Sequence, residues 1–350
     1  MTLKHFALPL LFAFGAVTGC ESYSADPLQI VAKLDTRPGN VIATPGGRVF
    51  TTMHPLDPAQ DIQLGEIVEG QLKPWPGRSI QANGSADVKL DTPLGISRDK
   101  QGGLWVVDIG FNTGVTRVFG FDIASGTSLG VFTVDSQVLP KGSFAQDLAV
   151  DRKRGVAYLA DLSSASIAVL DLNTGKSAKI SGHASLQAET DARMIINQKP
   201  VVFSGAAAEV AINPITLSND NQYLYFGAMN GTSWYRLATK DIDKARENPG
   251  DYIERVGPKP ISDGADTDAR GNHIFTNLND NGLDMLTPEG KLVPVIRDPR
   301  LDWADNVRFD GKTWLYLVVN QLHKSTAFTQ KADTATKPYY IYRIKHPLAR

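Results

Sequence analysis

Leu94-Gly95-Ile96-Ser97-Arg98-Asp99-Lys100-Gln101-Gly102-Gly103-Leu104-Trp105 contains an apolar run, a turn rich in Asp and Gly, and a second apolar run with an aromatic residue. Five other segments repeat this order. The aromatic positions of the six copies are Phe50, Trp105, Tyr158, Tyr225, Phe275 and Tyr316, which lie 41 to 67 residues apart. Each interval can hold a four-stranded sheet with its loops, and such a period is typical of a β-propeller. A β-sandwich is the alternative, but it gives no reason for six similar units.

We therefore predict an all-β protein, a six-bladed β-propeller of four-stranded antiparallel blades around a central channel. Residues 28–34 and 339–344 alternate apolar and polar side chains, as half-buried strands do. We expect these two terminal segments to share one blade and so close the ring. The only helix that we expect is short, between Lys240 and Glu247.

The N-terminus has the features of an export signal. Lys4 and His5 precede a continuous apolar stretch from Phe6 to Val17, which is too short to span a bilayer. Val17-Thr18-Gly19-Cys20 then resembles the lipobox of bacterial lipoproteins, in which the cysteine is lipidated. An ordinary signal peptide that happens to contain a cysteine is the alternative.

The predicted organisation is a signal peptide at residues 1–19, a lipidated tether at 20–27 and one propeller domain at 28–350. We expect an exported protein, attached to a cell-envelope membrane on its periplasmic or extracellular side through Cys20 alone.

Composition excludes several classes of protein. The formal net charge of -1 is not that of a nucleic-acid binder, which would carry a basic face. Cys20 is the only cysteine, so an internal disulfide and a thiolate metal cluster are both excluded. The sequence also lacks the H-E-x-x-H, P-loop and G-x-G-x-x-G motifs. We expect a monomer that is stabilised by its apolar core.

Several segments of the chain match one protein family in order and spacing. They are Pro45–Phe50 with His54, Gly103–Gly110, Asp161 with Ala168–Gly175, Trp303–Asn306, Asn320–Leu322 and Tyr342-Arg343. Together they resemble the yellow and major royal jelly protein family, from about residue 28 to 345. The chain lacks the cysteines of the secreted insect members. The resemblance implies a six-bladed propeller with a small-molecule pocket at one mouth of its channel, and it implies no single activity.

Candidate site residues follow from the predicted geometry of a blade. The first strand of each blade lines the channel, so the residue that opens it faces the axis. Counting back from the aromatic markers gives Asp147 (beside Gln146), Asn213, Asp263 and Asp305 in four consecutive blades. The first two blades have Gly39 and Pro93 there and add no carboxylate.

Other polar residues near the strand ends complete the predicted ligand-binding set. Asp108 and Asn320 follow second strands, and Asn306 lies beside Asp305. The alternative for each of these residues is a structural role, because Asp and Asn commonly cap turns by accepting hydrogen bonds from backbone N–H groups.

A second resemblance concerns Asn213–Asp220 and Ser262–Asp266, which are similar to blades of the regucalcin and gluconolactonase family. That likeness implies that Asn213 and Asp263 bind a divalent cation and that Asp263 acts as a general base. Oxygen ligands of this kind suit calcium, magnesium or manganese. The chain departs from that family at Gly39-Asn40-Val41, where the family has a metal-binding Glu.

Three functional hypotheses remain. The first is a propeller that binds a small organic ligand at the mouth of its channel, motivated by the family resemblance and the polar lining. The second is a divalent-metal-dependent lactonase or related hydrolase. The third is a scaffold whose rim loops bind another envelope protein.

Overall fold

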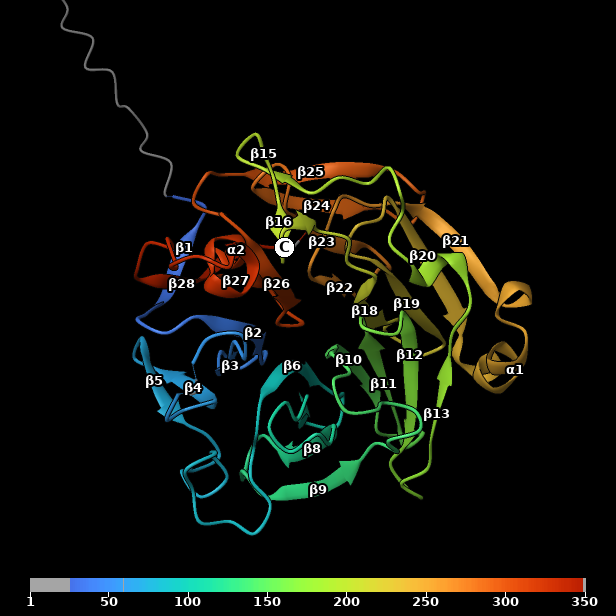
Figure 1. Cartoon of the computed structure of the whole chain (residues 1–350), viewed down its shortest axis with the longest axis horizontal. Coiled ribbons are helices and arrows are strands. Elements are labelled where there is room, and N and C mark those ends of the chain that lie inside the picture. Colours follow the sequence, from blue (N-terminus) through green and yellow to red (C-terminus); the bar gives the residue numbers. More distant parts are fainter. Residues whose placement is uncertain (1–25, 59, 349–350) are drawn as a thin grey trace, which may run out of the picture.

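The computed structural model describes residues 26–58 and 60–348, which form a six-bladed β-propeller (Figure 1). Each blade is a four-stranded antiparallel sheet. Blade 1 comprises β2 (Pro38–Ala43), β3 (Val49–Met53), β4 (Leu64–Val68) and β5 (Gln71–Pro74). Blade 2 comprises β6 (Pro93–Arg98), β7 (Gly103–Asp108), β8 (Arg117–Asp122) and β9 (Ser128–Thr133). Blade 3 comprises β10 (Ala145–Asp151), β11 (Val156–Asp161), β12 (Ser166–Asp171) and β13 (Ser177–Ile180).

The second half of the ring has the same plan. Blade 4 comprises β18 (Ile212–Leu217), β19 (Tyr223–Ala228), β20 (Ser233–Ala238) and β21 (Ile253–Pro258). Blade 5 comprises β22 (Ala265–Thr267), β23 (His273–Asn277), β24 (Gly282–Leu286) and β25 (Leu292–Arg297). Blade 6 comprises β26 (Ala304–Phe309), β27 (Trp314–Val319), β28 (Tyr339–Lys345) and β1 (Gln29–Leu34). The predicted fold is confirmed.

The ring closes through the two terminal strands, as predicted. β1 is the outermost strand of blade 6 and pairs antiparallel with β28, with Leu34 opposite Tyr339 and Gln29 opposite Arg343. The helices of the described chain are short. α1 (Ile242–Glu247) lies in the predicted segment, after a short 3-10 turn at Thr239–Asp241. Within the described residues no helix is long and apolar enough to cross a membrane. The predicted signal peptide and Cys20 lie outside the described residues.

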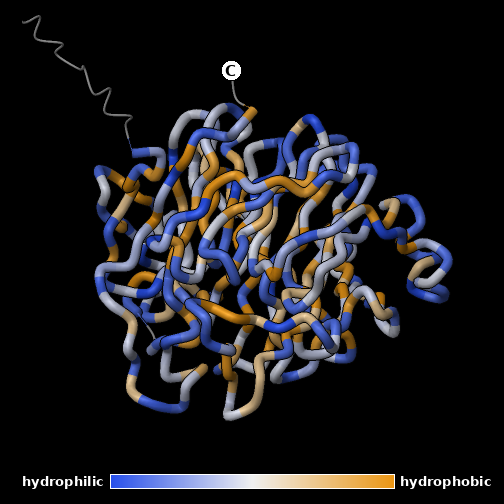
Figure 2. Tube along the Cα trace, turned by 90° about the horizontal axis from the view of Figure 1, so that it is seen from above, coloured by the Kyte–Doolittle hydropathy of each residue, from blue (hydrophilic) through white to orange (hydrophobic). Residues whose placement is uncertain are grey.

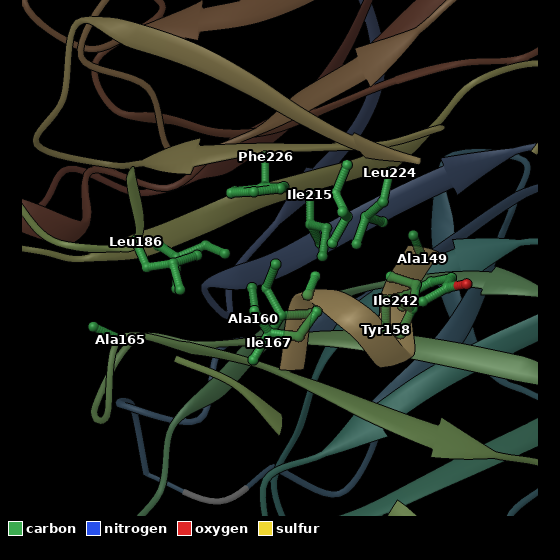
Figure 3. Packing of buried hydrophobic residues seen from close by; sticks show 14 residues of the cluster. Ala149, Tyr158, Ala160, Ala165, Ile167, Leu186, Ile215, Leu224, Phe226 and Ile242 are labelled. Carbon is green, nitrogen blue, oxygen red and sulfur yellow. The ribbon is translucent and has the colours of Figure 1, made fainter. Parts of the chain in front are cut away.

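The core lies between adjacent blades. Figure 3 shows the interface of blades 3 and 4, where Tyr158, Ile167, Ile215 and Phe226 pack together. The aromatic markers are buried there or at equivalent interfaces, and none is more than 9 % exposed. The inner strands are almost entirely buried, whereas an outermost strand such as β9 is largely accessible. In the side view of Figure 2, apolar segments run through the body and most of the connecting turns are polar.

The two ends of the channel differ. Each inner strand ends in a hairpin that leads to the second strand of its blade. The end of the channel that these hairpins surround is called the open mouth. The opposite end, where the inner strands begin, is covered by small elements and is called the capped mouth. Its cover contains β14 (Ile195–Ile196), β15 (Lys199–Pro200), β16 (Val202–Phe203), β17 (Ala206–Ala207), the 3-10 turn Leu322–Lys324 and α2 (Thr326–Thr329) (Figure 1). Met194, Ile196, Val201 and Phe328 pack with Trp303 in one apolar cluster, which seals this end.

Candidate functional site

The predicted site residues meet on the channel axis, where they form an axial cluster of buried polar side chains. Gln146 Nε2 donates to Asp263 Oδ1 over 2.8 Å, and Asn213 Nδ2 donates to the same oxygen. The other carboxylate oxygen of Asp263 accepts from Trp303 Nε1 at 2.7 Å. Asp263 is 2 % exposed, so these donors replace the water that an open carboxylate would bind.

Asp305 is the second carboxylate of the axial cluster. Its oxygens accept from Asn320 Nδ2 at 2.7 Å and from Asn40 Nδ2 at 3.2 Å. Asn306 Nδ2 in turn donates to Asn40 Oδ1 over 3.1 Å. The inner strands of blades 1 and 6 are therefore joined by side-chain amides.

Asp147 is the third carboxylate, and it differs from the other two because it has a cationic partner. Arg308 Nη2 lies 2.7 Å from both oxygens of Asp147, and Arg308 Nη1 donates to the Ala265 carbonyl at 2.5 Å. The pair crosses the channel from blade 6 to blade 3 at a sequence separation of 161 residues. Arg308 thus neutralises Asp147, and no cation of the described residues forms an ion pair with Asp263.

Burial dominates the electrostatics of the cluster. Burial and then the charge of Asp305 raise the pKa of Asp263 well above its usual range. Burial also raises the pKa of Asp305 to about 7, although hydrogen bonding from Asn320 favours the ionised form. Burial raises the pKa of Asp147, and the charge of Arg308 opposes this rise. The two carboxylates without a cation are thus the ones that hold protons most readily.

The fit of the cluster to a divalent cation is poor. Among the described residues, no group of three or more His, Cys, Asp or Glu side chains is arranged to hold a metal ion. Both oxygens of Asp263 already accept hydrogen bonds, and blade 1 contributes the neutral Asn40. One feature favours a ligand: Asn213 Oδ1 is buried beside Asp263 and has no hydrogen-bond partner in the described chain.

Asp108 lies apart from this cluster. Its carboxylate accepts from the backbone N–H groups of Asp91 and Thr92, at 3.0 and 2.6 Å. Burial raises the pKa of Asp108 to about 6. Through these contacts Asp108 holds the loop that enters β6. This is a structural role, the alternative given above for each polar candidate.

The open mouth contains a pocket of about 220 Å³. Each of the six inner strands contributes to its wall; one residue from each, in blade order, is Ile42, Arg98, Leu148, Thr216, Asp266 and Arg308. The hairpins add polar groups, among them Lys100, Ser218 and Asn219. Arg308 faces both the pocket and Asp147, so the axial cluster forms the inner end of this pocket.

The charged side chains that line the pocket differ in how they are paired. Asp266 accepts hydrogen bonds from the backbone N–H groups of Phe309 and Thr267. Asp99 accepts a hydrogen bond from Trp105 Nε1 and forms an ion pair with Arg152. Arg98 makes a single long contact, 3.4 Å to the Asp310 carbonyl. The exposed Lys100 forms no ion pair within the described residues. With Asp99 paired to Arg152 and Arg308 paired to Asp147, the remaining charges of the lining are Arg98, Lys100 and Asp266, so the net charge is positive.

Several of these residues were not among the sequence-based candidates. The count back from the aromatic marker of blade 1 gives Gly39, and it is the next residue of β2, Asn40, whose amide reaches Asp305. Arg308 carries no local motif, and only its distant partner Asp147 reveals its role. Arg98 and Lys100 lie at the end of the inner strand opposite to the predicted ring residues. Their place in the repeat, just before and within the turn, is the signal that could have found them.

Comparison with known proteins agrees with the architecture. The family model described as "Major royal jelly protein" matches residues 92–346, which is more than half of the chain. No curated protein sequence is significantly similar to the chain.

Three solved propellers illustrate the likeness of fold. Virginiamycin B lyase from Staphylococcus aureus is 15 % identical, with 91 % of this chain and 99 % of that chain covered at a TM-score of 0.51. A gluconolactonase from Xanthomonas campestris is 13 % identical, with 91 % and 89 % covered at 0.55. A luciferin-regenerating enzyme is 12 % identical, with 92 % and 96 % covered at 0.56. At these identities the likeness concerns the fold.

Proposed function

Because the chain belongs to the major royal jelly protein family, we propose that it is an exported, lipid-anchored propeller that binds a small organic ligand at the open mouth of its channel. The observation that carries this proposal is the pocket of about 220 Å³ framed by all six inner strands. A pocket at the channel mouth, built by rigid strands and lined by a few polar groups, is a common form of ligand site.

The lining favours a small, polar and negatively charged ligand. Arg98 and Lys100 supply more positive charge than the one unpaired carboxylate of the lining, Asp266, offsets. Thr216, Ser218 and Asn219 supply hydrogen-bonding groups. The volume lies below the roughly 300–1,000 Å³ of sites for drug-sized molecules, which favours a ligand of a few carbon atoms. Hydroxylated organic acids meet both conditions.

The axial cluster supports this proposal as the rigid inner end of the pocket. Asp147, Asp263 and Asp305 are each 2 % exposed or less, and the apolar cover lies on their other side. A ligand therefore has access to Arg308 from the open mouth without displacement of the cover.

A panel of sugar acids, hydroxy acids and small organic phosphates tests the proposal by thermal shift, followed by calorimetry on any compound that raises the melting temperature. Arg98→Gln is expected to weaken binding of that compound by about tenfold or more, because a charge-assisted hydrogen bond contributes roughly 1.5–3 kcal/mol. Lys199→Gln is the matched control, since it removes the same charge from the exposed β15 at the capped mouth. Equal affinity in Arg98→Gln and the parent would contradict the assigned pocket.

A divalent-metal-dependent lactonase is the second candidate, and the unpartnered Asn213 Oδ1 beside Asp263 favours it. Calorimetry of the parent against calcium and manganese, followed by a lactone hydrolysis assay, separates the two functions. Metal binding that Asp263→Asn abolishes, together with hydrolysis, would favour the lactonase. Absence of both, with an organic acid bound at the open mouth, would favour the binding protein.

A further inference from the structure

We infer that two copies of this chain associate edge to edge through β9, the outermost strand of blade 2. The inference goes beyond the proposed ligand site and is independent of it, because β9 contributes no residue to the open-mouth pocket. It replaces the monomer expected from the sequence with a two-fold dimer. The observations that carry it are the free backbone edge of β9 and the residues that distinguish this strand from the five other outermost strands.

The strand β9 is paired on one side only. Gly130 to Thr133 lie opposite Gly120 to Arg117 of β8. On the other side, no backbone N–H or C=O group of β9 is bonded to another element in the part of the chain that the structure describes. Figure 1 shows β9 at the lower rim of the ring, outside β8. Such a row of free donors and acceptors is a template for pairing with a further strand.

The other five outermost strands contain residues that oppose pairing with a further strand. β5 and β13 are only 4 residues long, and each has an exposed lysine. β1, β21 and β25 have exposed charged residues, and β25 has an exposed proline as well. These residues are Lys33, Lys73, Lys179, Glu254, Arg255, Pro294 and Arg297. Short length, charge and proline are the usual features by which proteins keep edge strands from associating.

The strand β9 has none of these protective residues. Its sequence, Ser-Leu-Gly-Val-Phe-Thr at 128–133, contains no charged residue and no proline, and the side chain of Val131 is 40 % exposed. The register of β9 with β8 skips Leu129, but β1, β21 and β25 each have a similar bulge. The bulge therefore does not set β9 apart, whereas the lack of charge and proline over six residues does.

The partner strand that matches this edge is the β9 of a second copy. Each of the other five outermost strands would bring a charge to the interface, so β9 is the one uncharged edge among the six that another copy can offer. Antiparallel pairing of a strand with its own copy about a two-fold axis gives a closed interface in which both copies use the same surface. Val131 lies at the middle of Ser128–Val134, so it is placed opposite its own copy.

Sedimentation velocity of the chain without its predicted signal peptide, carrying Cys20→Ser, tests the inference. We expect reversible dimers whose fraction rises with concentration. Val131→Lys should weaken association by at least about tenfold, because it places two like charges opposite each other at the two-fold axis. Val131→Glu should weaken it as well, and an equimolar mixture of the two variants should associate again. Val68→Lys is the matched control, because Val68 is 43 % exposed but belongs to β4, which has a strand on each side.

Cross-linking gives a second measurement, since the Cys20→Ser chain has no cysteine. Opposite residues of an antiparallel pair have Cα atoms about 4.5–5.5 Å apart, which is within disulfide range. Val131→Cys should therefore form a disulfide-linked dimer on mild oxidation, and Val68→Cys should not. A parent that stays monomeric at every concentration would overturn the inference and leave this edge to a strand of another protein. Association that Val131→Lys does not weaken, or that Val68→Lys weakens equally, would overturn it too.

Discussion

At the scale of single residues, the axial cluster holds two kinds of buried carboxylate. Asp147 has the Arg308 guanidinium at 2.7 Å, whereas Asp263 and Asp305 receive hydrogen bonds only from neutral amide and indole groups. Neutral donors compensate a buried negative charge less completely than a cation does. This difference makes the three residues respond differently to pH and to substitution.

Asp305 should make the stability of the protein fall as pH rises. Its folded-state pKa of about 7 exceeds the usual value of 3.8, so its contribution is complete below about pH 4 and is lost as pH rises through 7. Asp305→Asn removes this titration. The free energy of unfolding of the parent, measured in urea, should therefore decrease relative to that of Asp305→Asn between pH 4 and 8, by on the order of a few kcal/mol. A difference that stays flat, or one of opposite slope, would show that Asp305 is ionised and compensated by a cation.

Arg308→Met should destabilise the protein by about 3–5 kcal/mol, because it leaves the charge of Asp147 buried without its partner. Adding Asp147→Asn should restore most of the lost stability. Arg193→Met is a suitable control, since its pair with Glu209 is exposed and should contribute less than about 1 kcal/mol. Chemical denaturation of the parent, Arg308→Met, Asp147→Asn, the double variant and the control checks the prediction, and additive losses in the double variant would contradict it.

At the scale of the element, the inner strands crowd one another at the axis, and glycine permits this approach. A Cβ atom on Gly264 would lie 2.7 Å from Asn306 Cα and 2.8 Å from the Asp305 carbonyl oxygen. Both of these atoms belong to the backbone of β26, so they cannot yield as a flexible side chain would.

Gly264→Ala should therefore cost more than about 2 kcal/mol by overpacking. Gly77→Ala is the control, because no atom lies within 4 Å of the position of its Cβ and its backbone is not left-handed. Melting temperatures of the two variants provide the measurement. A Gly264→Ala protein as stable as the parent would mean that β22 and β26 are farther apart than described.

The blades were predictable because each is built from contiguous sequence with its own periodicity and turn chemistry. The cover of the capped mouth was not, since β14 to β17 are strands of two residues with no period to detect. Its apolar contacts with Trp303 and Phe328 join segments more than a hundred residues apart. Sequence could place Asp263 and Asp305 on the axis, but it could not show which end of that axis is closed.

At the scale of the whole molecule, the circular arrangement brings distant charges together. Asp147 and Arg308 meet across the channel, and all six inner strands together frame the open-mouth pocket. The predicted lipid anchor would hold this assembly at a membrane.

Replacement of Cys20 by Ser tests the anchor in the producing cell. The variant should leave the membrane fraction or retain its uncleaved signal, because it has lost the acyl chains that hold the protein. Fractionation in high-salt buffer, which screens electrostatic attachment, is the appropriate measurement. A processed variant that still partitions with membranes in high salt would exclude the lipid anchor.

The most direct test of the ligand site is electron density in crystals of protein extracted from its native envelope. We expect density for a small anionic molecule in the open-mouth pocket, in contact with Arg98 and within reach of Lys100 and Arg308. An empty pocket, together with a ligand or ion among Asn213, Asp263 and Asp305 beneath the cover, would contradict it.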